Sequence, residues 1–234
     1  MTFSPVTPAR GLFVAFEGGD GAGKSTQARL LAASLRSAGL GVLLTREPGG
    51  TPIGEKLRSL VLDHGQGEID PRTEALIFAA ARAAHVAQAI EPALARGDVV
   101  VTDRYIGSSI VYQGVGRGLG PDAVRGLNEW ATGGLWPDLT VLLDVDESEG
   151  RARRAAHEAG EDRLESEPDA FHREVRAAFL DLASARPDAY LVLDGRQDPA
   201  GLAEEILTAV LGALEARTAV VPPAAVPPSV GERR

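Results

Sequence analysis

Short apolar runs alternate along the chain with longer stretches of helical periodicity. The runs show little alternation of apolar and polar residues, which is typical of strands buried on both faces of a parallel sheet. They are Leu12–Phe16, Val42–Thr45, Val99–Thr102, Thr140–Val145 and Tyr190–Asp194. Strands separated by helices favour right-handed crossovers. The pattern therefore predicts an α/β three-layer sandwich, in which helices flank a five-stranded parallel sheet.

The stretches between these runs carry the helical pattern. Asp70 followed by Pro71 has the form of an N-cap residue with proline at the first helical position. Pro92 should kink or end the helix that begins there, since proline cannot donate a backbone hydrogen bond. The predicted helices are Thr26–Ala38, a long Ala-rich stretch from Pro71 towards Arg96, Pro168–Ala185 and Ala200–Ala216.

One domain is expected in a chain of 234 residues. We place it at residues 11–216, with a candidate lid at about 150–165. Residues 1–10 are predicted to be a flexible tail. Residues 217–234 include the segment "VVPPAAVPPSVGERR", which is rich in proline and has no apolar period, so a disordered tail is predicted there.

Composition narrows the classes of partner. The formal net charge of -9 argues against a broad electrostatic grip on nucleic acid or anionic membrane, so neither is expected as a partner. The chain has no cysteine, which excludes disulfides and thiolate metal sites. It has no apolar run of membrane-spanning length and no apolar signal core near its start, so a cytoplasmic location is predicted. His64, His85 and His172 show no metal-ligand spacing and receive no role.

The segment "FEGGDGAGKST" carries the clearest chemical signal. It fits the pattern GxxxxGK[ST] between a strand and a helix, which predicts a P-loop NTPase fold and a nucleoside triphosphate site. Glycines let backbone N–H groups surround phosphate oxygens, Lys24 supplies a cation, and the Ser25 hydroxyl can ligate Mg²⁺. The predicted ATP-binding residues are Gly18, Gly19, Asp20, Gly21, Ala22, Gly23, Lys24, Ser25 and Thr26.

The glycine loop does not identify the phosphate acceptor, but four further segments narrow the choice. They are "TREPGGT", "FAAAR", "DRYIGSSIVYQG" and "EDRLE". With these segments the chain closely resembles the thymidylate kinases, a family of nucleoside monophosphate kinases, in order from about Leu12 to about Leu214. The resemblance implies phosphoryl transfer from ATP to dTMP with Mg²⁺, giving dTDP, and it implies a homodimer.

The resemblance also assigns the acceptor site. It implies that Arg46 and Arg104, which follow two strands, hold the monophosphate of dTMP, and guanidinium groups suit that dianion. It places Phe78 against thymine and Arg82 at the carbonyl edge of the base. Asp20 is expected to accept from the sugar 3′-hydroxyl. Ser108, Ser109, Tyr112 and Gln113 are expected to line the nucleoside pocket. Taken from the residues alone, Phe78 and Tyr112 could equally be core aromatics.

The remaining assignments concern the metal and the lid. Asp103 is expected to assist Ser25 at the metal, although it could instead orient Arg104 or form a structural salt bridge. The variable positions of the glycine loop lack a basic residue, a pattern that in the family goes with catalytic arginines on a mobile lid. Relatives often carry an arginine at the position of His157. Lys24, Arg104, Arg153 and Arg163 are predicted to be catalytic, and the choice among the lid arginines Arg151, Arg153, Arg154 and Arg163 stays open.

Two other readings of the motifs remain. The first is another nucleotide or deoxynucleoside kinase, but a nucleoside acceptor would need a base for its 5′-hydroxyl and would make no use of paired arginines. A GTPase or ATPase switch is the second alternative, yet the chain contains no Asn-Lys-x-Asp segment for guanine. The segment "LDGRQDP" follows the last predicted strand, where the family contacts adenine.

Overall fold

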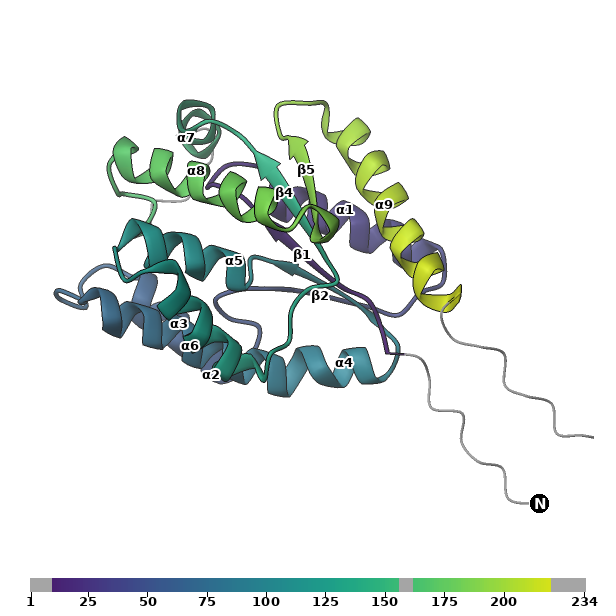
Figure 1. Cartoon of the computed structure of the whole chain (residues 1–234), viewed down its shortest axis with the longest axis horizontal. Coiled ribbons are helices and arrows are strands. Elements are labelled where there is room, and N and C mark those ends of the chain that lie inside the picture. The colour runs from purple at the N-terminus through teal and green to yellow at the C-terminus, as the bar shows by residue number, and fades with distance from the viewer. Residues whose placement is uncertain (1–9, 156–161, 220–234) are drawn as a thin grey trace, which may run out of the picture.

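The computed structural model describes residues 10–155 and 162–219, and it contains the predicted α/β three-layer sandwich (Figure 1). Its sheet has five parallel strands in the order β2-β3-β1-β4-β5. Each strand begins and ends within one residue of its predicted position. The strands are β1 (Phe13–Glu17), β2 (Val42–Arg46), β3 (Val99–Asp103), β4 (Leu139–Asp144) and β5 (Tyr190–Asp194).

The four predicted helices are present, and further helices join them. Neither α2 nor α6 was predicted, although each begins with a proline at its first position, and α2 is capped by Thr51. The helices are α1 (Lys24–Ser37), α2 (Pro52–Leu62), α3 (Pro71–His85), α4 (Glu91–Ala95), α5 (Ile106–Ser109), α6 (Pro121–Thr132), α7 (Glu147–Ala155), α8 (Asp169–Ala185) and α9 (Pro199–Ala219), with π-helical turns at Val86–Ile90 and Ile110–Gly116 and a 3₁₀ turn at Pro187–Ala189.

The long Ala-rich helix was expected to kink or end at Pro92. The helix does not end there, because a π-helical turn at Val86–Ile90 joins α3 to α4 and Pro92 lies in the first turn of α4. Proline has no N–H to donate, and a widened turn before it accommodates the missing hydrogen bond.

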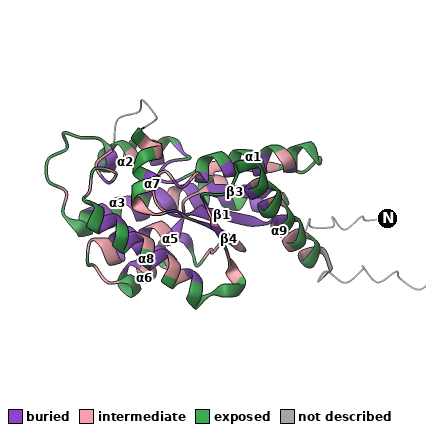
Figure 2. Ribbon diagram, turned by 90° about the horizontal axis from the view of Figure 1, so that it is seen from above, coloured by how far each residue is buried: buried purple, intermediate pink, exposed green. Residues whose placement is uncertain are grey.

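Both faces of the sheet are covered, as the uninterrupted apolar runs predicted. Val14 and Phe16 of β1 point into a core shared with α1 and α9. Phe13 and Ala15 point to the opposite face, where they pack against the segment from Val86 to Ile110. Figure 2 shows these strands as the most buried part of the molecule. The sheet is therefore packed on both faces, and ligands of such sheets bind at the carboxyl ends of the strands.

The predicted tails lie almost entirely outside the described residues, which omit 1–9 and 220–234. Residues 217–219, which we assigned to the C-terminal tail, belong to α9. The first proline of the tail comes only at Pro222, so nothing in the sequence ends the helix at residue 216. Within the described ranges, no helix is long and apolar enough to cross a membrane.

Candidate active site

One cleft of about 1080 Å³ opens at the carboxyl ends of the strands. All nine residues predicted to bind the second substrate line it, and so do Ser25 and Asp103. Of the other predicted site residues, Gly18, Gly19 and Arg163 are not among those that line the cleft. Segments far apart in the sequence thus meet where the crossover topology predicts a ligand site.

The phosphate loop has the geometry that its glycines permit. Gly18, Gly21 and Gly23 have φ angles of 133°, 79° and 95°, which side chains on these residues would strain. Helix α1 begins at Lys24 and directs its positive end toward the cleft. The Lys24 Nζ donates to Gly19 O at 2.6 Å. Burial and the nearby charge of Arg104 lower the pKa of Lys24 to about 8.

Arg104 and Asp20 form the centre of the site. The Arg104 guanidinium ion-pairs with the Asp20 carboxylate, and the Tyr112 hydroxyl donates to the same carboxylate at 2.8 Å. Although burial alone would raise it, the charge of Arg104 holds the pKa of Asp20 well below its usual range. The guanidinium also lies 5.2 Å from the centre of the Tyr112 ring. Asp20 is thus an ionised acceptor at the cleft wall.

Glu17 supports this arrangement from the end of β1, and sequence reasoning missed it. Its buried carboxylate accepts from the backbone N–H groups of Tyr105 and Ser108 at 3.0 Å and from Ser108 Oγ at 2.6 Å. Arg104 lies at the start of this turn with φ 69°, an uncommon angle for a residue with a side chain. Burial raises the pKa of Glu17. The carboxylate therefore holds the turn that directs Arg104 into the cleft.

The acceptor side of the cleft carries a third arginine, Arg58 of α2. Arg46 forms a bidentate ion pair with Glu55, with N–O distances of 3.0 and 2.9 Å. Arg58 donates to Pro48 O at 3.1 Å, and burial and the charge of Arg46 lower the pKa of Arg58. Three guanidinium groups thus line one side of the cleft. No sequence motif marked Arg58, because helix α2 itself was not predicted.

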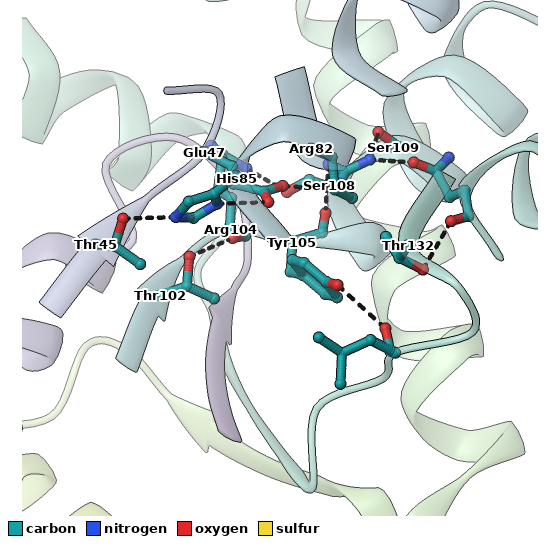
Figure 3. A network of polar contacts seen from close by, with 12 residues as sticks. Thr45, Glu47, Arg82, His85, Thr102, Arg104, Tyr105, Ser108, Ser109 and Thr132 are labelled. Atoms are coloured by element: carbon teal, nitrogen blue, oxygen red, sulfur yellow. Dashed lines mark hydrogen bonds and ion pairs between the residues drawn. The ribbon is translucent and has the colours of Figure 1, made fainter. Parts of the chain in front are cut away.

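The base side of the predicted pocket is formed by α3 and the π-helical turn that follows α5. Phe78 and Tyr112 belong to one buried apolar cluster and also line the cleft, so each is a core aromatic that reaches the predicted pocket. Arg82 is 3% exposed and donates to Glu47, Ser109 and Asn128 (Figure 3). Gln113 Nε2 donates to the buried carboxylate of Glu74 at 2.9 Å.

The residues predicted for the metal contact each other. Ser25 Oγ donates to Asp103 Oδ2, which lies at the end of β3 beside the phosphate loop. Both groups are hard oxygen donors, which Mg²⁺ prefers, and Mg²⁺ usually takes only one or two protein ligands beside phosphate oxygens and water. The absence of any cluster of three acidic, histidine or cysteine groups among the described residues is compatible with such a site. The pair fits Mg²⁺ chemically.

The lid arginines separate in the structure. Arg153 and Arg154 of α7 line the cleft, and Arg154 donates to the backbone carbonyl of Asp20 at 3.0 Å. The Arg154 Nε is buried without a hydrogen-bond partner among the described residues. Arg153 donates to Gly195 O at 2.9 Å, within the segment where we expected the adenine contact. Arg154 thus contacts the phosphate loop, and Arg153 contacts the segment that follows β5.

The other two lid arginines face elsewhere. Arg151 ion-pairs with Asp169 and is exposed. Arg163 is not brought into the cleft, because its guanidinium ion-pairs with buried Glu74 and donates to Val61 O at 3.0 Å. Its predicted catalytic role therefore has no support from this arrangement. His157, which occupies the position of a common family arginine, lies outside the described residues.

Comparison with known proteins gives one consistent result. The family model for thymidylate kinase matches residues 16–206. The chain is 52% identical to the thymidylate kinase of Cutibacterium acnes over 204 residues, which cover 87% of this chain and 98% of that protein. Identity to the thymidylate kinase of Leifsonia xyli subsp. xyli is 53% over 196 residues, covering 84% and 92%. The crystal structure of thymidylate kinase from Ehrlichia chaffeensis superposes with a TM-score of 0.70 at 32% identity, covering 86% of this chain and 99% of that one.

Proposed function

The chain belongs to the thymidylate kinase family and phosphorylates dTMP to dTDP with ATP, and from this premise we propose which residues perform the reaction. The phosphate loop binds the ATP phosphates. Arg46, Arg58 and Arg104 hold the monophosphate of dTMP, and Arg82 recognises its base. The observation that carries this assignment is that the phosphate loop and these arginines line a single cleft.

The residues supply charge and position rather than a catalytic base. The attacking oxygen of dTMP belongs to a phosphate that is already ionised, so no side chain needs to remove a proton. That oxygen bonds to the γ-phosphorus while the bond from this phosphorus to the bridging oxygen breaks, and ADP leaves. The barrier arises from repulsion between anions and from charge spread in the transition state. Fixed cations in a water-poor cleft lower both the repulsion between the anions and the energy of the charge spread in the transition state.

We assign the lid contribution to Arg154 first. The Nη1 atom of Arg154 lies against the phosphate loop. The buried Nε of Arg154 has no hydrogen-bond partner among the described residues, so an anion would complete the hydrogen bonding of this side chain. Arg153 sits nearer to the segment that we propose for adenine. Arg163, assigned to catalysis from the sequence, is better described as a lid anchor on Glu74.

Mg²⁺ would be held by Ser25, with Asp103 as a ligand or as an acceptor from a metal-bound water. When bound, the ion neutralises charge on the transferring phosphates. The two side chains already orient one another through their hydrogen bond. Asp103 also lies beside Arg104, so it serves the metal and the acceptor arginine from one strand end.

An acceptor screen tests the function. ADP release is followed by a coupled assay with dTMP, dUMP, dCMP, CMP, thymidine or no acceptor, and the largest kcat/KM is expected with dTMP. Turnover without any monophosphate would instead favour an NTPase switch. Preference for thymidine over dTMP would favour a deoxynucleoside kinase and would contradict the role of the paired arginines.

We also propose that the chain forms a homodimer through α2, α3 and α6. The three helices pack as neighbours (Figure 1), and each leaves at least one large apolar side chain exposed. Leu76 is 57% exposed and Trp130 is 84% exposed, and Ile53 and Leu60 are also exposed. A second copy of the chain would cover this face. Sedimentation of the wild type and of Leu76→Glu tests it, with a dimer and a monomer as the expected results. The cytoplasmic location stays a prediction.

A further inference from the structure

A chain of buried hydrogen bonds links strand β2 to Arg82 (Figure 3). Thr45 Oγ1 lies 2.7 Å from His85 Nε2, and His85 Nδ1 lies 2.9 Å from Glu47 Oε1. The second oxygen of Glu47, Oε2, accepts from Arg82 Nε at 2.6 Å. The side chains of His85 and Glu47 are 0% and 3% exposed. The hydrogen bonds therefore lead from half-buried Thr45, next to Arg46, through buried His85 and Glu47 to the base side of the cleft.

The guanidinium of Arg82 is held in one orientation by this chain and by α6. The Nη1 atom of Arg82 donates to Ser109 Oγ at 2.8 Å and to Asn128 Oδ1. Its Nη2 atom donates to Tyr105 O at 3.1 Å. A guanidinium has five N–H donors. Four of them are directed at Glu47, Ser109, Asn128 and Tyr105. One N–H of Nη2 is therefore available to a ligand. Since Arg82 lines the cleft, that single donor suits a single acceptor.

The carboxylate of Glu47 fixes the position of one proton on the His85 ring. A carboxylate can only accept, so the proton that joins His85 to Glu47 lies on Nδ1. Nε2 faces the hydroxyl of Thr45, which can donate to the ring or accept from it. In this arrangement every donor has one acceptor, and Glu47 receives a donor on each of its oxygens. Removing the ring would leave Glu47 Oε1 without its partner in a buried position.

His85 also supports the loop that follows β2. A Cβ added to Gly50 would lie 2.6 Å from His85 Nε2, so the bare backbone of Gly50 packs against the imidazole. Gly50 has φ 78°, and its N–H donates to Glu55, the ion-pair partner of Arg46. The same ring therefore touches the loop on the monophosphate side and the carboxylate that holds Arg82.

We propose that His85 is a positioning residue for base recognition, acting on Arg82 through Glu47. The ring holds Glu47, and Glu47 fixes the guanidinium so that its remaining N–H meets a carbonyl oxygen of the pyrimidine. A base with an amino group at that edge would set a donor against a donor and be rejected. The inference rests on the proposed role of Arg82 in reading the base.

Substitutions of His85 separate positioning from simple packing. An asparagine in its place would put the amide nitrogen near the position of the histidine Nδ1, within reach of Glu47, whereas a glutamine fills more space but places its amide near Nε2. We expect His85→Ala and His85→Gln to raise KM for dTMP about tenfold, with kcat within threefold and KM for ATP unchanged. The ratio of kcat/KM for dTMP over dCMP should fall about tenfold. His85→Asn should lie close to the wild type.

The alternatives give different results. If the ring only fills space, the larger glutamine should restore KM better than asparagine, which would overturn the inference. Loss of kcat with unchanged KM for dTMP would do the same. Long-range ¹H–¹⁵N spectra of the wild-type protein add a measurement that needs no variant. A proton on Nδ1 is expected for His85, and protonation on Nε2 alone would contradict the hydrogen bond from His85 to Glu47.

Arg82→Lys is the reference variant, since lysine keeps a charge beside Glu47 but lacks the planar fork. It should lose the preference for dTMP over dCMP. If it does so while His85→Ala and His85→Gln keep the preference, the inference fails and the proposed function stands. A wild type without preference for dTMP would instead overturn the proposed function, and with it the role of His85.

Discussion

The Arg104 guanidinium forms an ion pair with the Asp20 carboxylate, across 84 positions of sequence. Asp20 lies in the phosphate loop, and Arg104 lies just after β3. The acceptor arginine and the donor loop are therefore one electrostatic unit in this structure. The Tyr112 hydroxyl, which donates to the same carboxylate, extends the unit into the nucleoside pocket.

Asp20→Ala should abolish the preference for a sugar 3′-hydroxyl. A hydrogen bond to a charged group contributes about 1.5–3 kcal/mol, which corresponds to about tenfold or more in kcat/KM. The wild type should therefore prefer dTMP over its 3′-deoxy analogue by that factor, and the ratio should approach one in the variant. Steady-state kinetics with both acceptors measures it. Exposed Asp181 on α8 offers the control Asp181→Ala, whose ratio should stay that of the wild type.

Arg58→Ala should weaken dTMP binding while ATP binding is retained. The guanidinium lies beside Arg46 in a partly desolvated position, where a dianion would relieve the repulsion between the two cations. We expect KM for dTMP to rise about tenfold, because one charge-assisted contact is lost. Arg36→Ala on the last turn of α1 is the matched control. An unchanged KM for dTMP would exclude Arg58 from the acceptor site.

ATP binding should weaken as the pH rises through about 8. The pKa of Lys24 is lowered to about 8 by burial and by Arg104, so the side chain is a cation below that pH and neutral above it. Polyphosphate favours the cation, and its affinity should therefore fall on the alkaline side. Titration of a non-hydrolysable ATP analogue between about pH 6.5 and 9.5 measures this. Lys24→Arg should move the alkaline limb upward, since arginine stays charged throughout.

Arg154→Ala and Arg163→Ala should have different effects. Arg154 contacts the phosphate loop, so its loss should lower kcat about a hundredfold with KM for dTMP within threefold. Arg163 neutralises buried Glu74, and its loss should chiefly lower the unfolding temperature. Single-turnover kinetics and thermal unfolding of both variants separate these effects. A catalytic defect confined to Arg163→Ala would restore the assignment made from the sequence.

Gly150→Ala should slow catalysis although alanine favours a helix. A Cβ at Gly150 would collide with the Asp20 carbonyl, because α7 packs directly on the phosphate loop there. The helix must then move away, carrying Arg153 and Arg154 with it. We expect kcat to fall at least tenfold. Gly212→Ala in α9 meets open space, so this control should keep its activity and gain up to about 1 kcal/mol of stability.

Much of the fold could be read from local pattern. The five strands are uninterrupted apolar runs, because a sheet covered on both faces needs no alternation, and each was located within one residue. Helices α2 and α6 were missed. The Thr51 cap of α2 and the first-position prolines of both helices were visible in the sequence, but only tertiary packing distinguishes such segments from long loops.

The residues of the candidate site likewise fall into those that the sequence located and those that only the folded structure revealed. Lys24, Ser25 and the glycines form a contiguous motif whose geometry is local, so sequence alone located them. Arg163 carried the same motif evidence as its neighbours in the lid, and the buried carboxylate of Glu74 decides that it faces away from the cleft. No sequence motif marked His85 or Arg58 as a site residue. Their proposed roles depend on the hydrogen bond between His85 and Glu47 and on the charge of Arg46 near Arg58, and such interactions across elements exist only after the chain has folded.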